Sequence, residues 1–151
     1  MHARLEPHAV HPDGLADAVL LVDDELLGQH VEHLAVARER HGLGLIEHTL
    51  EVQFDIDHSV VTENAGLRAA IEKLPGRRYI FTNGSVAHAD KVLGRIGLQG
   101  LFDDVFDIRA ADWTPKPHAA TYERFLAATA VRPRESAMFE DLAHNLEAAH
   151  A

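Results

Sequence analysis

The chain has 151 residues, of which 46% are hydrophobic and 25% are charged, and this composition excludes a disordered or collagen-like protein. Its 14 Lys and Arg against 24 Asp and Glu give a formal net charge of −10, which argues against binding to nucleic acid or to an anionic membrane. Cysteine is absent, so a disulfide scaffold, thiol catalysis and cysteine-ligated zinc are excluded. Because every apolar run is too short to cross a bilayer, we expect a cytoplasmic protein.

The first 64 residues carry few regular patterns. Residues 1–15 lack any periodicity and predict a loose arm. Residues 16–64 predict a degenerate first strand followed by a small helical insert at about residues 26–60. The apolar run at residues 18–22 suits a buried strand or part of a helix equally well, because periodicity does not separate the two in so short a segment.

From residue 65 to residue 151 the patterns of helix and strand alternate, which predicts an α/β core. Apolar residues at helical spacing put Leu67 and Val86 on inward-facing helix stripes. The predicted helices cover residues 67–74, 86–96, 122–129 and 142–149, and the predicted strands cover residues 78–82, 105–108 and 136–139. This alternation is typical of βαβ units, so we expect a three-layer, Rossmann-type parallel sheet.

Polar residues follow the first two predicted strands, at the edge where parallel sheets bind ligands. Thr82, Asn83 and Gly84 offer a hydroxyl and backbone N–H groups at the start of a helix, and such groups can hold a phosphate. Lys116 lies between two prolines and supplies a positive charge on a stiff loop. Taken alone, each of these features also suits an ordinary strand end or a solvated loop residue.

The third strand ends in a pair of carboxylates, Glu140 and Asp141. Carboxylate oxygens are the ligands that Mg²⁺ prefers, although the same residues also suit the acidic first turn of the following helix. A hydroxyl, a lysine and a magnesium site that meet at one edge of a sheet indicate phosphoryl-transfer chemistry.

Several stretches of the chain resemble motifs two, three and four of the haloacid dehalogenase-like hydrolases, and most closely those of the pyrimidine 5′-nucleotidase branch. They are Phe81-Thr82-Asn83-Gly84, Lys116-Pro117, Phe139-Glu140-Asp141 and Asn145-Leu146. The resemblance implies that Thr82 and the two residues after it bind the phosphate and that Lys116 neutralises it. It also implies that Asp141 binds Mg²⁺, with Glu140 in the outer shell of the ion.

The family's reaction starts from an aspartate in the pattern Asp-x-Asp-x-Thr on the central strand, and two segments compete for this role. Asp55 and Asp57 match the spacing of the two aspartates, but the preceding segment alternates in polarity, whereas a central parallel strand is continuously apolar. Asp23 follows the apolar run, but Glu25 and Leu27 stand where Asp and Thr belong. Asp23 and Asp55 are therefore both candidates for the nucleophile.

The resemblance implies a Mg²⁺-dependent phosphomonoesterase that acts on a nucleoside monophosphate or another small phosphate ester. One alternative is a catalytically inactive fragment that lacks the nucleophile and at most binds phosphate and Mg²⁺. A second alternative is a transition-metal site at His30, His33 and His41. We further expect a sheet that is incomplete at both ends, a helical cap remnant, and self-association through unpaired strand edges.

Overall fold

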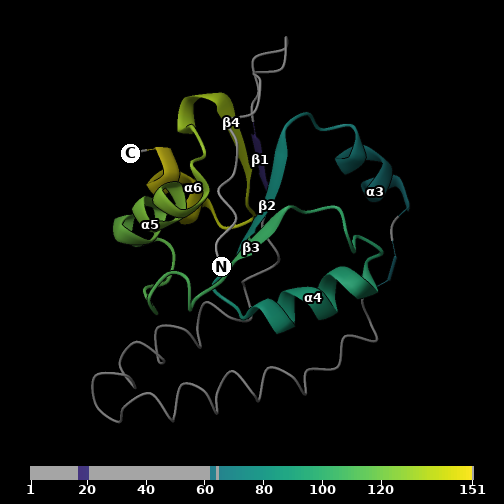
Figure 1. The fold of residues 1–151 in the computed structure, drawn as a ribbon, viewed down its shortest axis with the longest axis horizontal. Coiled ribbons are helices and arrows are strands. Elements are labelled where there is room, and N and C mark those ends of the chain that lie inside the picture. Colours follow the sequence, from purple (N-terminus) through teal and green to yellow (C-terminus); the bar gives the residue numbers. More distant parts are fainter. Residues whose placement is uncertain (1–16, 21–61, 64, 151) are drawn as a thin grey trace.

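The computed structural model describes residues 17–20, 62–63 and 65–150. These residues form a four-stranded parallel sheet in the order β3-β2-β1-β4, with helices on both faces (Figure 1). The strands are β1 (Asp17–Leu20), β2 (Arg77–Phe81), β3 (Asp104–Phe106) and β4 (Ser136–Phe139). The helices are α3 (Ala65–Glu72), α4 (Val86–Arg95), α5 (Ala119–Thr129), the 3-10 turn η2 (Pro133–Glu135) and α6 (Ala143–His150). The predicted α/β fold with a parallel sheet is confirmed.

The apolar run that the sequence left open between strand and helix contributes a central strand. Leu20, the last residue of β1, is paired with Ile80 of β2 on one side and with Phe139 of β4 on the other. A strand between two neighbours has both backbone edges paired, which suits a continuously apolar segment. Asp23 follows this strand three residues later in the chain.

Several predictions fall on residues outside the described part of the chain. They are the loose arm, the helical insert, the nucleophile candidates Asp23 and Asp55, and the histidines His30, His33 and His41.

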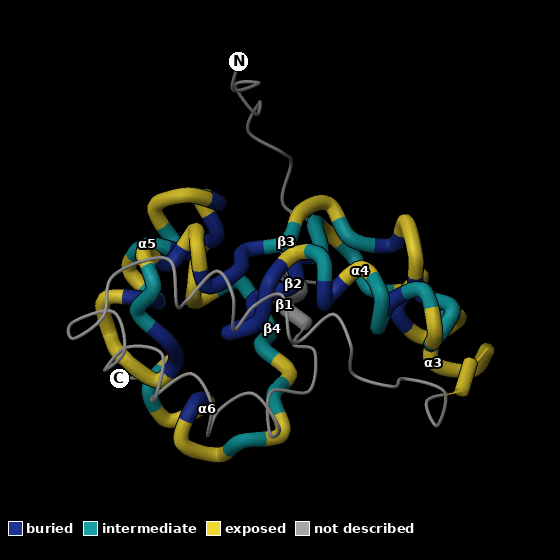
Figure 2. The backbone as a smooth tube through the Cα atoms, turned by 90° about the horizontal axis from the view of Figure 1, so that it is seen from below, coloured by how far each residue is buried: buried dark blue, intermediate teal, exposed yellow. Residues whose placement is uncertain are grey.

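Two apolar cores cover the two faces of the sheet, because successive side chains of β2 point in opposite directions. Phe81 faces α5, where its ring stacks on that of Phe125 with 4.7 Å between the ring centroids. Ile80 faces α4 and packs in a cluster with Leu93 of that helix. The last three residues of β2 are buried, whereas most of α3 is exposed (Figure 2).

Two residues that the helical spacing placed inward are exposed, so this part of the prediction is wrong. Leu67 is 39% exposed, because α3 reaches the core through Ile71 instead. Val86 is 42% exposed, because it begins α4 at the edge of the sheet, where its N–H donates to Asp107. Helix periodicity defines a stripe but does not say how far along the helix the contact with the sheet extends.

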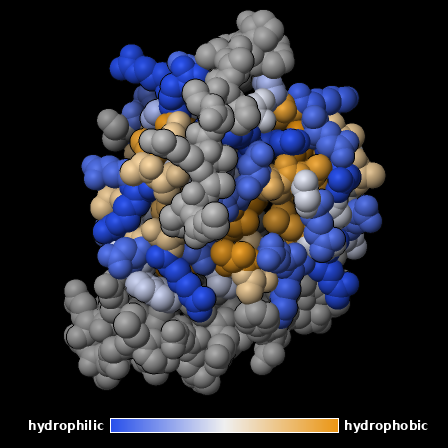
Figure 3. All heavy atoms as spheres, in the orientation of Figure 1, coloured by the Kyte–Doolittle hydropathy of each residue, from blue (hydrophilic) through white to orange (hydrophobic). Residues whose placement is uncertain are grey.

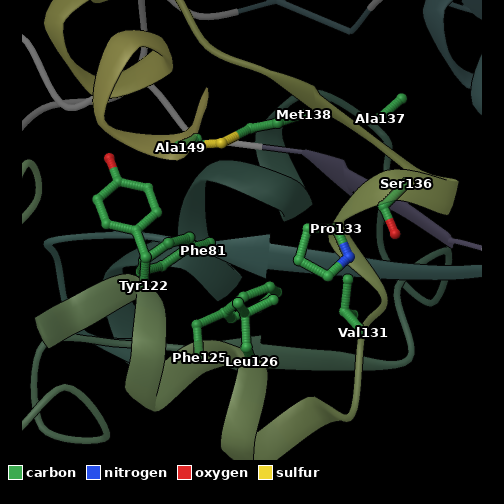
Figure 4. A pocket seen from close by; sticks show the side chains of 10 residues that line it. All are labelled: Phe81, Tyr122, Phe125, Leu126, Val131, Pro133, Ser136, Ala137, Met138 and Ala149. Atoms are coloured by element: carbon green, nitrogen blue, oxygen red, sulfur yellow. The ribbon is translucent and has the colours of Figure 1, made fainter. Parts of the chain in front are cut away.

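A small cavity of about 100 Å³ lies between α5, β4 and α6 (Figure 4). It is lined by Phe81, Tyr122, Phe125, Leu126, Val131, Pro133, Ser136, Ala137, Met138 and Ala149. In the view of Figure 3, hydrophobic residues gather near the middle of the visible face and hydrophilic residues surround them.

Within the described ranges, none of the helices has the length and apolar character needed to cross a membrane.

Among the described strands, β4 lies at one end of the strand order, and we propose that the expected self-association occurs through this edge. Phe139 in β4 is 49% exposed, and the strand holds no charged residue or proline that would discourage pairing with another strand. We predict that the protein elutes earlier from a size-exclusion column as its concentration rises. Phe139→Lys should suppress this shift, whereas Leu67→Lys, a matched change on exposed α3, should not. A wild-type elution volume that is independent of concentration would contradict the prediction.

Candidate active site

Three chain segments meet at the ammonium group of Lys116. Its Nζ donates to the carbonyl oxygen of Phe81 at 3.0 Å and to Oε2 of Glu140 at 3.1 Å. The side chains of Lys116 and Glu140 are both 0% exposed. The ends of β2 and β4 and the loop before α5 therefore converge on a buried ion pair. A buried pair of this kind depends on both of its charges, since either charge alone is strongly unfavourable away from water.

Asn83 fixes the backbone of the lysine loop. Its Oδ1 accepts a hydrogen bond from the Lys116 N–H at 2.7 Å, and its Nδ2 donates to the Lys116 carbonyl oxygen at 3.3 Å. Both residues are buried. The side chain that the sequence assigned to phosphate binding thus holds the lysine loop against the end of β2.

The turn between β2 and α4 is closed by hydroxyl groups. Thr82 Oγ1 accepts from the backbone N–H of Gly84 at 2.9 Å, and Ser85 Oγ caps α4 by accepting from His88 N at 3.2 Å. Thr82 is only 1% exposed. The turn therefore places a hydroxyl and the start of a helix at the same edge as Lys116, and helix N-termini attract anions.

The Lys116 loop is also held by α5. Thr121, in the first turn of that helix, donates through Oγ1 to the carbonyl oxygens of Thr114 at 2.5 Å and Pro115 at 3.3 Å. Before the lysine, Asp112 and Trp113 take left-handed backbone angles with φ of 51° and 60°. Such angles are uncommon for residues other than glycine, so this loop has a specific shape.

The carboxyl groups of Glu140 and Asp141 differ in their surroundings. Burial, and then the neighbouring carboxyl of Asp141, raise the pKa of Glu140, while the charge of Lys116 opposes this rise. The neighbouring carboxyl of Glu140 lowers the pKa of Asp141, which lies exposed at the surface. Glu140 is thus the inner carboxyl of the pair and Asp141 the outer one.

Of the two carboxyl groups, that of Asp141 is suited to bind Mg²⁺ directly. Mg²⁺ keeps several waters and is commonly held through one or two carboxylates, so an exposed aspartate suits it. Glu140 is engaged elsewhere, because its Oε2 accepts from both Lys116 and Asn145 and its Oε1 accepts from Leu142 N. Among the described residues there is no group of three or more His, Cys, Asp and Glu that could hold a metal.

The structure brings the predicted residues together to different degrees. Asn83 and Glu140 both contact Lys116 directly, whereas Asp141 is joined to it through Glu140. Thr82 directly follows Phe81, whose carbonyl oxygen accepts from the lysine.

Asp107, Thr121 and Asn145 all support the site, although no individual role was predicted for them. Asn145 was singled out only as part of a stretch that resembles a family motif. Asp107 is buried at the end of β3 and accepts backbone N–H groups from Val86 at 3.3 Å and Ala110 at 2.9 Å. Asp107 falls within the strand predicted over residues 105–108, and an aspartate near the end of an apolar strand is the signal that could have pointed to it. Thr121 lies within a helix, where the sequence gives no comparable signal, and the only signal for Asn145 is the family resemblance.

Comparison with known proteins gives a family and a fold. A family model described as haloacid dehalogenase-like hydrolase matches residues 9–151. The L-2-haloacid dehalogenase from Xanthobacter autotrophicus, solved with chloropropionic acid covalently bound, is 15% identical with a TM-score of 0.60, and the match covers 90% of this chain and 74% of that one.

Two further solved structures have the same fold. A HAD-superfamily hydrolase of subfamily IA from Geobacter sulfurreducens is 20% identical with a TM-score of 0.55, over 90% of this chain and 84% of that chain. The YfnB protein of Bacillus subtilis, solved bound to magnesium, is 15% identical with a TM-score of 0.53, over 90% and 82% of the two chains. At these identities the matches show a shared fold.

Proposed function

The chain belongs to the haloacid dehalogenase-like hydrolases, and from this premise we propose that it is a Mg²⁺-dependent phosphomonoesterase similar to the pyrimidine 5′-nucleotidases. Its substrate is a small phosphorylated molecule, either a nucleoside monophosphate or another small phosphate ester. The observation that carries the proposal is the buried ammonium of Lys116, held between Phe81 and Glu140 where the parallel strands end. A fixed cation at this edge is suited to the negative charge of a phosphoryl group.

Each of the described site residues has a separate role in binding the phosphate. The Lys116 ammonium neutralises the phosphoryl oxygens, and the Thr82 hydroxyl donates a hydrogen bond to them. The N–H of Gly84 donates to Thr82 Oγ1, so Gly84 holds the turn that presents this hydroxyl. Asn83 binds the phosphate through its backbone, because its side-chain amide holds the Lys116 loop. Asp141 supplies a carboxylate to Mg²⁺, which offsets negative charge on the phosphoryl group when it is bound.

The central place of β1 supports Asp23, rather than Asp55, as the nucleophile. In the proposed reaction a carboxylate oxygen of Asp23 attacks phosphorus, the ester bond breaks, and the alcohol leaves with a proton from an acid. Water then attacks the acyl phosphate, which releases inorganic phosphate and restores the carboxylate. Glu25, two residues after Asp23, is the proposed acid and base of the two steps.

A second candidate is a module that binds phosphate and Mg²⁺ without turnover. It is favoured by Glu25 and Leu27, which stand where the family pattern has Asp and Thr. Phosphate release from cytidine or uridine monophosphate in the presence of Mg²⁺ separates the two candidates. Chloride release from 2-chloropropionate is the control for dehalogenation. Release of chloride alone, or of neither product, would overturn the phosphomonoesterase proposal.

We expect phosphate release to depend on Mg²⁺ bound through Asp141. We expect EDTA to abolish phosphate release and added Mg²⁺ to restore it, because Mg²⁺ offsets phosphoryl charge that Lys116 alone does not balance. Asp141→Asn should raise the Mg²⁺ concentration needed for half-maximal activity by about tenfold or more, since it removes a charged ligand. The control is Asp112→Asn, which changes an exposed aspartate on the loop before Lys116. Equal Mg²⁺ dependence of the two variants would contradict the assignment of Asp141.

A further inference from the structure

Asn145 is a buried polar residue in the first half of α6. It is 0% exposed, although helix positions that face a sheet are normally apolar. Its Nδ2 donates to Glu140 Oε2 at 3.0 Å, and its backbone carbonyl accepts from the Tyr122 hydroxyl at 2.8 Å. The other side-chain atom, Oδ1, has no hydrogen-bond partner among the residues that the structure describes. The side chain is therefore only half satisfied.

A buried acceptor without a donor is destabilising, so packing alone does not explain an asparagine here. Leucine has a similar volume and would bring no unpaired oxygen. What asparagine adds is the N–H group directed at Glu140. That same Oε2 atom accepts from the Lys116 ammonium at 3.1 Å. Two donors at one carboxylate oxygen restrict its rotation, and the carboxylate in turn restricts the ammonium.

We propose that Asn145 is a positioning residue for Lys116 and acts on it through Glu140. The inference rests on the proposed phosphomonoesterase function, in which Lys116 carries the charge that faces the phosphoryl group. Without the Asn145 N–H, the carboxylate and the ammonium can shift together within their buried site. A displacement of about 1 Å in a positioned group can lower a rate by about 100-fold. Asn145 therefore sets the geometry of the cation and does not itself touch the substrate.

The competing explanation is a structural tie between α6 and α5, through the bond from the Tyr122 hydroxyl to the Asn145 carbonyl oxygen. Asn145→Leu and Tyr122→Phe distinguish the two, because each removes one hydrogen bond of the same residue. The first removes the bond to Glu140 and keeps the backbone carbonyl. The second removes the bond to that carbonyl and keeps the side-chain amide.

Steady-state kinetics with cytidine monophosphate and Mg²⁺, together with melting temperatures, test the proposal. For Asn145→Leu we expect kcat to fall about 10- to 100-fold, with KM within about threefold of wild type and an unchanged melting temperature. For Tyr122→Phe we expect a lower melting temperature and a kcat within about twofold of wild type. In a Lys116→Met background, Asn145→Leu should cause no further loss of kcat. An equal loss in both backgrounds, or a loss that follows the melting temperature, would overturn the proposal.

A readout that does not depend on turnover keeps the two proposals separate. In protein labelled with ¹⁵N-lysine, the ammonium signal of Lys116 can be assigned by its loss in Lys116→Met. We expect Asn145→Leu to shift or broaden this signal and Tyr122→Phe to leave it in place. A Lys116 signal unchanged by Asn145→Leu would overturn the positioning role. If wild type releases no phosphate, the proposed function fails, and the spectra still decide whether Asn145 is coupled to Lys116.

Discussion

Lys116→Met is expected to abolish most phosphate release and to destabilise the fold at once. The loss of activity should be about 100-fold or more in kcat, because a fixed cation at a developing phosphoryl charge is removed. The free energy of unfolding should fall by about 3–5 kcal/mol, since Glu140 keeps its buried position without its charged partner. Chemical denaturation and phosphate release measured on the same preparation check both effects.

A second substitution separates these two losses. Lys116→Met combined with Glu140→Gln removes both charges of the buried pair, and replacing a whole pair is far less costly than breaking it. We expect the double variant to regain most of the lost stability and none of the lost activity. Recovery of activity along with stability would show that Lys116 only supports the fold.

Asp23→Asn is expected to reduce phosphate release to background while Asp55→Asn leaves it within about twofold of wild type. The amide cannot act as the nucleophile that forms the acyl phosphate, and removal of a nucleophile typically costs about 10⁴-fold or more in kcat. The two changes are chemically identical, so they form a matched pair. Trapping of ³²P from labelled substrate on acid-quenched protein measures the covalent step directly.

The opposite result for the two variants would assign the nucleophile to Asp55. If Asp55→Asn alone abolishes phosphate release, the chemistry belongs to the Asp55 segment and the support that β1 lends to Asp23 is misleading. If both variants retain wild-type activity, neither aspartate forms the covalent intermediate.

The sequence by itself predicted the helices and strands that hold the site residues, because the patterns that mark them are local. Helix and strand periodicity and the Gly and Pro residues at their ends gave the described strands and helices of residues 65–150 to within a few residues. The polar residues at three strand ends were also visible, since carboxyl ends of parallel strands share one edge. Lys116 and Glu140 could therefore be singled out before any contact between them was known.

Only the tertiary structure decided which segment lies inside the sheet and which buried residues support the lysine. The apolar run that forms β1 is too short for its periodicity to separate strand from helix, and its pairing with both β2 and β4 settled the question. The contact between Lys116 and Glu140 spans 24 residues, and Asn145 joins it from α6. The family resemblance singled out Asn145, but helix periodicity does not show that it contacts Glu140. Periodicity reports on neighbours within a few residues, whereas the buried network depends on segments that meet only when the sheet is assembled.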